Sequence, residues 1–253
     1  TMRFQETLAF DDVLLVPKYS DIESRKEVSL SCKLGNIELD LPIISSPMDT
    51  VTEKDMAVAI SLAGGLGIVH RYNTVVQQSD IVQRAIQDGA KIIGAAIGVT
   101  GDYIERAEKL LAAGAKVLCV DVAHGDHISV KNAIRDLRAR FGSAVHIMAG
   151  NVATLEGYNH VSFWGADSVR VGIGGGSICS TRIQTGHGVP TLSSIMECVH
   201  SEHDTSLIAD GGIKEIGDVC KAIGAGADFV MLGGMFAGTD ECEGEWEYEF
   251  WAE

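Results

Sequence analysis

Short apolar runs alternate with amphipathic segments along most of this chain, and this alternation restricts the possible folds more than any other feature. Several apolar runs are continuous, which is typical of parallel strands buried on both faces. The segments 102–113 and 129–141 have the polarity pattern and the length of crossover helices. Eight strands are predicted in this way, at 41–46, 67–70, 91–97, 116–122, 146–149, 168–172, 206–209 and 228–232.

The connections between these units repeat a short sequence motif. Gly-Ala-Lys occurs at 89–91 and 114–116, and Gly-Ala-Asp occurs at 165–167 and 226–228. A glycine just past the end of a helix, followed by a short turn, closes a βα unit with few residues. Eight such units predict a single (β/α)8 TIM barrel over residues 1–253. A doubly wound α/β sheet is the alternative, although no G-x-G-x-x-G follows the first strand and opens a helix.

Composition argues against several kinds of partner. The formal charge of −15 disfavours nucleic acid and anionic membranes, because these select clustered Lys and Arg. No apolar run approaches the ~18 residues of a membrane span, and the first residues lack a signal-peptide pattern, so a cytoplasmic protein is expected. Six cysteines lie scattered without a C-x-x-C pair, which predicts reduced thiols rather than disulfides or a zinc site.

Polar and glycine-rich residues follow most of the predicted strands. In a barrel the carboxyl ends of the strands meet at one mouth, where reactive groups gather. Glycine clusters follow the last three strands, so we expect backbone N–H groups to hold a phosphate there in spite of the acidic composition. The residues expected at the mouth are Ser46, Met48, His70, Asp121, Asn151, Asp210, Gly212, Gly233 and Gly234, with the loop 172–182.

The loop 172–182 reads Gly-Ile-Gly-Gly-Gly-Ser-Ile-Cys-Ser-Thr-Arg and carries one cysteine, Cys179. Glycines let bare N–H groups approach a phosphate, and a thiol among such groups and beside Arg182 ionises more easily. The loop is therefore interpreted as an anion cradle joined to a nucleophile. An ordinary glycine turn with a buried, inert cysteine is the alternative.

Three other residues at the predicted mouth have two interpretations each. Asp210 accepts the hydroxyl protons of a ribose, or else it caps a turn, as Asp before Gly often does. Met48 packs in the core, or it supports a flat aromatic ring. His70 is expected to be a hydrogen-bonded residue at the end of a strand rather than a catalytic base.

Five motifs, in order along the chain, resemble those of the IMP dehydrogenase and GMP reductase family. The resemblance runs from Phe10 to about Gly244. It implies an oxidoreductase that moves a hydride between C2 of IMP or GMP and a nicotinamide dinucleotide, NAD or NADP, and that assembles as a homotetramer. The motifs are Phe-Asp-Asp-Val-Leu-Leu-Val-Pro at 10–17, Ser-Ser-Pro-Met-Asp-Thr-Val-Thr-Glu at 45–53, Ala-Gly-Asn-Val at 149–152, the loop 172–182, and Ala-Asp-Gly-Gly at 209–212.

The resemblance also implies roles for individual residues. Cys179 would attack C2 of the purine, and Thr181 would lie near the group that enters or leaves there. Adding a thiolate to C2 makes a tetrahedral centre from which hydride leaves, which divides one difficult step into two. The other implied roles are Ser46 and Met48 at the base, Asp210 at the ribose, Ser177, Gly212, Gly233 and Gly234 at the 5′-phosphate, Asp121, Asn151 and Gly172 at the dinucleotide, and the carbonyls of Gly174, Gly176 and Cys179 at a potassium ion.

The chain departs from the family pattern in several places. Family loops often have Pro where Gly175 stands and Thr where Ser180 stands. Only a short connection follows the second strand, so the pair of CBS modules that many IMP dehydrogenases carry there is absent. Family members continue past the eighth strand with a flap that activates water or ammonia, whereas this sequence stops at Glu253. Hydrolysis of the covalent intermediate is therefore the step that the resemblance supports least.

Local motifs divide between the two reactions of the family. The missing CBS insertion and the segments 24–28 and 232–238 are more similar to GMP reductase. The segments 45–53, 64–70, 153–154 and 208–213 are more similar to IMP dehydrogenase, and the body of the barrel favours that reaction. Two other possibilities stay open: a nucleotide-binding barrel without turnover, and an unrelated barrel enzyme acting on a phosphorylated sugar.

Overall fold

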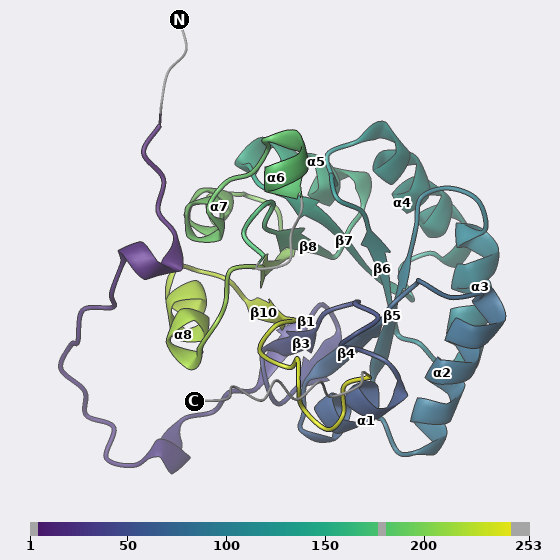
Figure 1. Cartoon of the computed structure of the whole chain (residues 1–253), viewed down its shortest axis with the longest axis horizontal. Coiled ribbons are helices and arrows are strands. Elements are labelled where there is room, and N and C mark those ends of the chain that lie inside the picture. The colour runs from purple at the N-terminus through teal and green to yellow at the C-terminus, as the bar shows by residue number, and fades with distance from the viewer. Residues whose placement is uncertain (1–4, 177–180, 244–253) are drawn as a thin grey trace, which may run out of the picture.

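Eight parallel strands close into a barrel, and helices surround it (Figure 1). The computed structural model describes residues 5–176 and 181–243. The strand order around the barrel is β10-β3-β4-β5-β6-β7-β8-β9, which confirms the predicted (β/α)8 architecture. The barrel strands are β3 (Ile43–Ser45), β4 (Leu66–Val69), β5 (Ile93–Ile97), β6 (Val117–Asp121), β7 (His146–Val152), β8 (Ser168–Val171), β9 (Ser206–Asp210) and β10 (Phe229–Leu232).

All eight predicted strands are present, and β7 differs most from its prediction. It continues to Val152, beyond the predicted end at 149, so Asn151 lies within the strand and not after it. Asp121 and Asp210 are likewise the last residues of β6 and β9. Asn151 and Asp210, which lie beyond the ends of the predicted strands, therefore belong to strands, as Asp121 does within its predicted strand, and strands hold side chains more rigidly than loops do.

Helices cover the outside of the barrel. The predicted helices at 102–113 and 129–141 are confirmed as α3 and α4. Gly114 and Gly165 follow α3 and α5 with φ of +112° and +116°, the left-handed conformation that ends a helix. The helices are α1 (Lys54–Leu62), α2 (Val75–Gln87), α3 (Tyr103–Ala113), α4 (Ile128–Phe141), α5 (Leu155–Trp164), α6 (Thr181–Thr185), α7 (Thr191–Cys198) and α8 (Ile216–Gly224), with two short 3-10 helices at Phe10–Asp12 and Arg25–Glu27. In the described part of the chain, no helix combines the length and the hydropathy needed to cross a membrane.

The two Gly-Ala-Asp connectors have the same structure. The carboxylate of Asp167, just before β8, accepts a hydrogen bond from the backbone N–H of Ile147 in β7 at 2.7 Å. The carboxylate of Asp228, just before β10, accepts one from the N–H of Leu207 in β9, also at 2.7 Å. Each aspartate thus ties the start of one strand to the start of its neighbour, which explains why the motif recurs.

A small hairpin that the sequence did not predict closes the bottom of the barrel. Strands β1 (Cys32–Leu34) and β2 (Ile37–Leu39) pair antiparallel at the face where the barrel strands begin. Leu34 and Leu39 are buried in the cluster that fills the barrel interior, together with Phe229 from β10. Strands of three residues are too short to show a clear hydrophobic period, so the sequence could not predict this hairpin.

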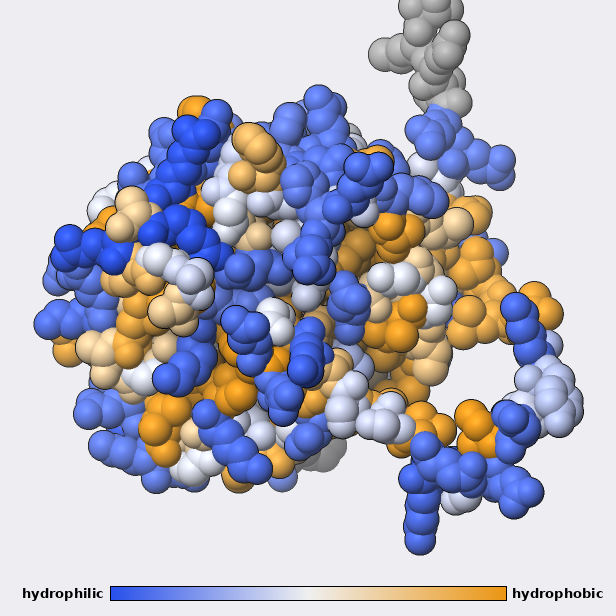
Figure 2. Space-filling view, turned by 180° about the vertical axis from the view of Figure 1, so that it is seen from behind, coloured by the Kyte–Doolittle hydropathy of each residue, from blue (hydrophilic) through white to orange (hydrophobic). Residues whose placement is uncertain are grey.

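The segment 13–31 forms an arm that stands off the barrel (Figures 1 and 2). Its apolar side chains are largely in solvent: Leu14 is 86% exposed and Tyr19 is 94% exposed. Exposed apolar residues gathered in one segment mark a surface that another molecule covers more often than a surface that stays in water.

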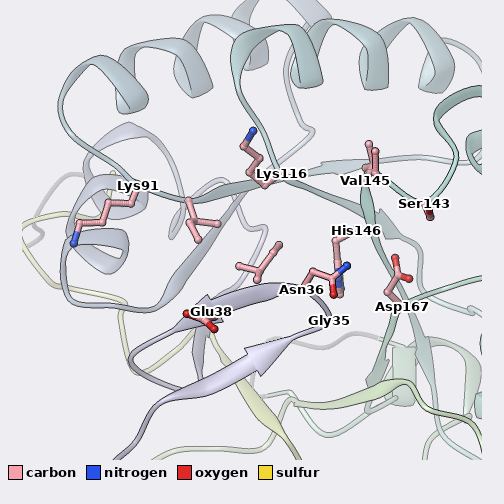
Figure 3. Close-up of a pocket in the computed structure, with 12 residues that line it drawn as sticks. Gly35, Asn36, Glu38, Lys91, Lys116, Ser143, Val145, His146 and Asp167 are labelled. Atoms are coloured by element: carbon pink, nitrogen blue, oxygen red, sulfur yellow. The ribbon is translucent and has the colours of Figure 1, made fainter.

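A cavity lies at the bottom of the barrel, beside the hairpin (Figure 3). It measures about 580 Å³ and is lined by Lys91, Lys116 and His146, among others. His146 is buried, and its Nε2 lies 2.8 Å from the hydroxyl of Ser168. Burial, assisted by the nearby charge of Arg138, lowers the pKa of His146 to about 4. The imidazole is therefore neutral in the folded protein near pH 7.

His146 makes the fold sensitive to acid. In the unfolded chain a histidine takes up its proton near pH 6.5, whereas the folded protein resists protonation down to about pH 4. The unfolded state thus binds more protons between these values, so stability is complete above pH 6.5 and falls as the pH drops toward 4. Urea unfolding should show a loss of about 1–2 kcal/mol between pH 7 and pH 5 from this residue. His146→Gln should lack that part of the loss; an unchanged pH dependence in the variant would contradict the assignment.

Candidate active site

The turns after β8, β9 and β10 meet at the mouth of the barrel around a cavity of about 340 Å³. We call it the Met48 cavity. Residues from both ends of the chain line it, because β10 pairs with β3 and closes the barrel. The structure therefore brings together six residues that the sequence placed at one site: Ser46, Met48, Asp210, Gly212, Gly233 and Gly234.

Two of the glycine turns touch through backbone alone. Gly211 and Gly212 have φ of +93° and +79°, which only glycine adopts readily. A Cβ on Gly211 would lie 3.1 Å from the backbone nitrogen of Gly176, and one on Gly212 would lie 3.2 Å from the carbonyl oxygen of Gly175. Side chains at these positions would push the two turns apart, so the shape of the cavity depends on glycine.

Met48 lies at the cavity wall and not in the core. The loop that carries it is fixed by Thr52, whose hydroxyl donates to the carbonyl oxygen of Ser46 at 2.6 Å. Ser46 is itself held by a hydrogen bond from its N–H to the carbonyl of Leu232 at 3.0 Å. A Cβ on Gly233 would lie 2.9 Å from the Met48 sulfur, so the half-buried thioether rests on this glycine. This position suits contact with a flat ligand better than core packing.

A second cavity, of about 260 Å³, opens on the other side of Asp210. We call it the Asn151 cavity. The residues predicted to lie near the dinucleotide, Asp121, Asn151 and Gly172, all line it, and so does Thr181. Asn151 also forms part of the wall between the cavities, because its Nδ2 donates to the carbonyl of Gly172 and to Oδ2 of Asp210, both at 2.8 Å.

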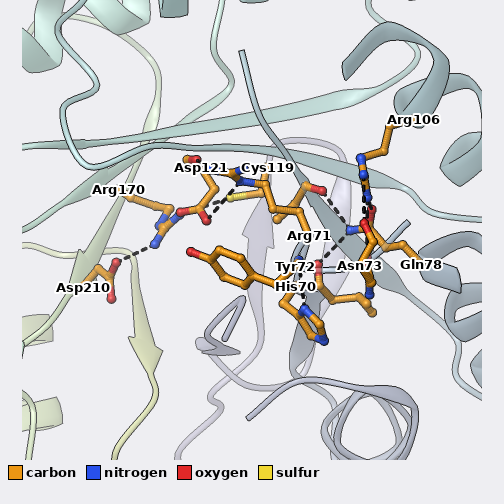
Figure 4. Close-up of polar contacts among 12 residues, drawn as sticks. His70, Arg71, Tyr72, Asn73, Gln78, Arg106, Cys119, Asp121, Arg170 and Asp210 are labelled. Carbon is orange, nitrogen blue, oxygen red and sulfur yellow. Dashed lines mark hydrogen bonds and ion pairs between the residues drawn. The ribbon is translucent and has the colours of Figure 1, made fainter. Parts of the chain in front are cut away.

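Arg170, at the centre of this wall, is the important residue that sequence analysis missed (Figure 4). Its Nη1 lies 2.6 Å from Oδ1 of Asp121, and its Nη2 lies 2.9 Å from Oδ2 of Asp210. Burial lowers the pKa of Arg170, but the surrounding negative groups, Asp121 and Asp210 among them, raise it well above the usual value. A charged residue within an apolar strand, Ser-Val-Arg-Val, was the signal in the sequence.

Cys119 lies under the same arginine, 3.4 Å from Nη1, but it is no nucleophile. Complete burial raises the pKa of its thiol to about 12, so the sulfur stays protonated. The predicted nucleophile Cys179 and the predicted phosphate ligand Ser177 lie outside the described residues, as does Ser180. The residues that flank this stretch line different cavities: Gly176 the Met48 cavity and Thr181 the Asn151 cavity.

His70 has the structural role expected for it. The side chain is buried, and its Nδ1 accepts a hydrogen bond from the N–H of Tyr72 at 3.1 Å. The proton therefore sits on Nε2, which donates to Glu53 at 2.8 Å. With both nitrogens occupied, His70 fixes the turn after β4 near the Asn151 cavity.

The same architecture and motifs occur in known proteins. The profile of the IMP dehydrogenase / GMP reductase domain matches residues 7–249. The chain belongs to the IMP dehydrogenase / GMP reductase family. Members of this family are oxidoreductases that act on IMP or GMP with a nicotinamide dinucleotide.

Individual members of the family are similar to this chain over nearly all of its length. It is 33% identical to the inosine-5′-monophosphate dehydrogenase of Nitrosopumilus maritimus, covering 96% of this chain and 77% of that protein. It is 40% identical to the GMP reductase of Serratia proteamaculans, covering 96% and 73%. The crystal structure of Trypanosoma brucei GMP reductase in complex with guanosine 5′-triphosphate superposes with a TM-score of 0.89 at 28% identity, covering 94% of this chain and 88% of that one. Proteins of both names thus resemble this family member.

Replacing Gly211 by Ala should damage both the fold and the Met48 cavity. The positive φ alone costs about 1–2 kcal/mol for a residue with a side chain, and the added Cβ also presses on the backbone of Gly176. Gly89→Ala is a matched control, because Gly89 has φ of +102° and nothing within 4 Å of its Cβ position. Urea unfolding should show losses in both variants, larger in Gly211→Ala. Calorimetry with IMP should show on the order of tenfold weaker binding in Gly211→Ala alone; equal affinities would disprove the contact.

Proposed function

We propose that this protein is an IMP dehydrogenase, oxidising IMP to XMP with NAD+ through a covalent intermediate on Cys179. One observation carries the proposal: the Met48 and Asn151 cavities adjoin at a common wall of Asp210, Asn151 and Arg170. Two ligands bound in these cavities would extend past the edge of that wall and bring their reacting ends into the direct contact that hydride transfer requires.

The Met48 cavity suits the nucleotide. Its glycine turns, Gly211–Gly212 and Gly233–Gly234, offer backbone N–H groups to a 5′-phosphate without any need for basic side chains. The carboxylate of Asp210 would accept the ribose hydroxyls, and Ser46 and Met48 would contact the base. Binding an anion through N–H groups is consistent with the acidic composition of the chain.

The Asn151 cavity suits the nicotinamide end of the dinucleotide, which accepts the hydride. Asn151 has an Oδ1 and Arg71 an Nε that are buried and unpartnered among the described residues. Together they offer one acceptor and one donor, which complement a carboxamide. Asp121, at the end of β6, would hold a ribose of the dinucleotide, and Gly172 lines the same cavity.

The chemistry assigned to Cys179 rests on the resemblance of the loop 172–182. Its thiolate would add to C2 of the hypoxanthine ring, forming a carbon–sulfur bond and breaking the C2–N3 double bond. The electron pair of that bond would pass to N3. The hydrogen on C2 would then leave as hydride to a nicotinamide ring in direct contact with C2 at the edge of the wall, and the C2–N3 double bond would re-form. Water would finally replace sulfur at C2, which releases XMP and restores the thiol, with Thr181 near the entering oxygen.

Potassium is proposed as the cation of this loop. The carbonyl oxygens of Gly174 and Gly176 accept no hydrogen bond from the described residues, so they are available to a cation. Neutral carbonyl oxygens suit a monovalent ion that sheds its water easily. The third proposed ligand is the carbonyl of Cys179, and the bound ion would keep the cysteine loop in one conformation.

A homotetramer is the proposed assembly. The exposed apolar side chains of the arm, residues 13–31, include Leu14, Val16 and Tyr19, and they need cover that the barrel of the same chain does not provide. A second copy of the chain is the partner that the family resemblance indicates.

GMP reductase is the second candidate, because relatives of both names match this chain. Nicotinamide absorbance at 340 nm decides between them. With IMP and NAD+ the signal should rise, and with GMP and NADPH it should stay constant. A signal with GMP and NADPH alone would establish the reductase. Silence in both assays, with IMP still bound in calorimetry, would favour a nucleotide-binding barrel without turnover.

Cysteine alkylation tests the nucleophile against internal controls. Iodoacetamide should label Cys179, and IMP should protect it. Cys119 and Cys198 should stay unlabelled with or without IMP, because burial raises the pKa of each thiol to about 12. Exposed Cys220 should be labelled equally in both cases. Peptide mass spectrometry reads all four sites, and labelling of Cys179 that IMP leaves unchanged would count against the covalent role.

Substitution of the nucleophile gives an independent test. Cys179→Ala should lower kcat by at least about a thousandfold, since Cys119, the buried thiol under Arg170, stays protonated and cannot take over the role. IMP should still bind, because the glycine turns and Asp210 are unchanged. Turnover at the wild-type rate would rule out the covalent intermediate on Cys179.

A further inference from the structure

Arg170 lies between the two cavities and is bonded to a residue of each (Figure 4). We propose that Arg170 is a positioning residue that couples the two sites, so that a purine nucleotide in the Met48 cavity strengthens binding of the dinucleotide in the Asn151 cavity. The inference rests on the proposed function, since it needs both ligands. It adds to that function a thermodynamic link between the sites.

Each carboxylate divides its two oxygens between Arg170 and a cavity. Oδ2 of Asp210 accepts from Arg170 and from Asn151, at 2.9 and 2.8 Å, whereas its Oδ1 has no hydrogen-bond partner among the described residues. Oδ1 of Asp121 accepts from Arg170 at 2.6 Å, and its Oδ2 has only a distant cation, Arg71, at 3.9 Å. Asp210 lines the Met48 cavity and Asp121 lines the Asn151 cavity. One oxygen on each side is therefore free for a ribose hydroxyl.

The guanidinium of Arg170 is planar and rigid, so it can couple the position of one carboxylate to that of the other. Its two Nη atoms diverge at a fixed angle, so a shift toward one carboxylate changes the bond to the other. The side chain is buried, with 6% of its surface exposed, which keeps water from replacing either bond. When hydroxyls fix Asp210, they also fix Arg170 and thereby Asp121. The second ligand then meets an ordered carboxylate and loses less entropy on binding.

The variant Arg170→Lys distinguishes coupling through the guanidinium from simple neutralisation of the two carboxylates. Lys keeps the positive charge between the two carboxylates, but its single ammonium group lacks the two-pronged geometry. If Arg170 only neutralises Asp121 and Asp210, Arg170→Lys should keep the link between the sites. If the two-pronged guanidinium couples the sites, Arg170→Lys should bind each ligand alone, but binding of one ligand should no longer lower the Kd of the other.

Arg106 supplies a matched control. It is also buried, with 7% of its surface exposed, and it pairs with Asp102 at 3.0 Å and with Gln78 at 2.8 Å. It stands on α3, outside the residues that line either mouth cavity. Arg106→Lys therefore imposes a similar loss of buried hydrogen bonds without touching the wall between the cavities.

The test uses GMP and NAD+, a pair that cannot react, because C2 of GMP carries no hydrogen and NAD+ no hydride. Calorimetry gives the Kd of NAD+ with and without saturating GMP, and linkage requires the same ratio when the order is reversed. In the wild type we expect a Kd for NAD+ on the order of tenfold lower when GMP is bound. Arg106→Lys should keep this ratio, and Arg170→Lys should bring it below about twofold.

Three outcomes bear on the inference. A tenfold ratio that persists in Arg170→Lys overturns it, and so does a wild type that binds both ligands independently. A wild type that binds neither IMP nor NAD+ overturns the proposed function, and the inference with it. If Arg170→Lys does not fold, Asp121→Ala serves instead, because it removes the acceptor of Nη1 on one side only. NAD+ alone should then bind more weakly, and the ratio should again fall below about twofold.

Discussion

Closure of the barrel is the constraint on which the rest of the structure depends. Strand β10 pairs with β3 in register, Val230 beside Ile43, and the N–H of Ser46 bonds the carbonyl of Leu232 just beyond them. Because all the strands are parallel, closure places every carboxyl end on one face. Met48 near the start of the chain thus rests on Gly233 near its end. Neither half of the chain could form the Met48 cavity alone.

Two structural features meet at the mouth of the barrel: the glycine turns and the ion pairs of Arg170. Glycine turns form the proposed phosphate site, and they touch one another so closely that a Cβ at Gly211 would disturb them. The wall beside them holds a buried guanidinium whose desolvation is offset by bonds to Asp121 and Asp210. Removing either carboxylate would leave a buried charge poorly paired. The backbone cradle and the ion-paired wall are therefore parts of one rigid arrangement built on strands.

Sequence patterns predicted the eight barrel strands and residues that line the Met48 cavity. The eight barrel strands follow from apolar runs and from the Gly-Ala-Asp connectors, whose aspartates bond the neighbouring strand. The hairpin of β1 and β2 was missed because three residues carry no readable period. Arg170 was missed for another reason: a polar residue in an apolar strand shows that a partner exists, but not which partner. Asn151 was placed in a loop because β7 stays buried further than its apolar run extends.

By itself the sequence determined the alternation of strands and helices and the glycines at the last three turns, and it predicted Cys179 as the nucleophile. These are local properties, set by the periodicity of side chains and by the freedom of glycine at positive φ. Only the tertiary structure decided which side chains share a partner. Arg170 reaches Asp121 across 49 positions and Asp210 across 40, and hydrogen bonds of that kind depend on the register and closure of the barrel, which no local pattern contains.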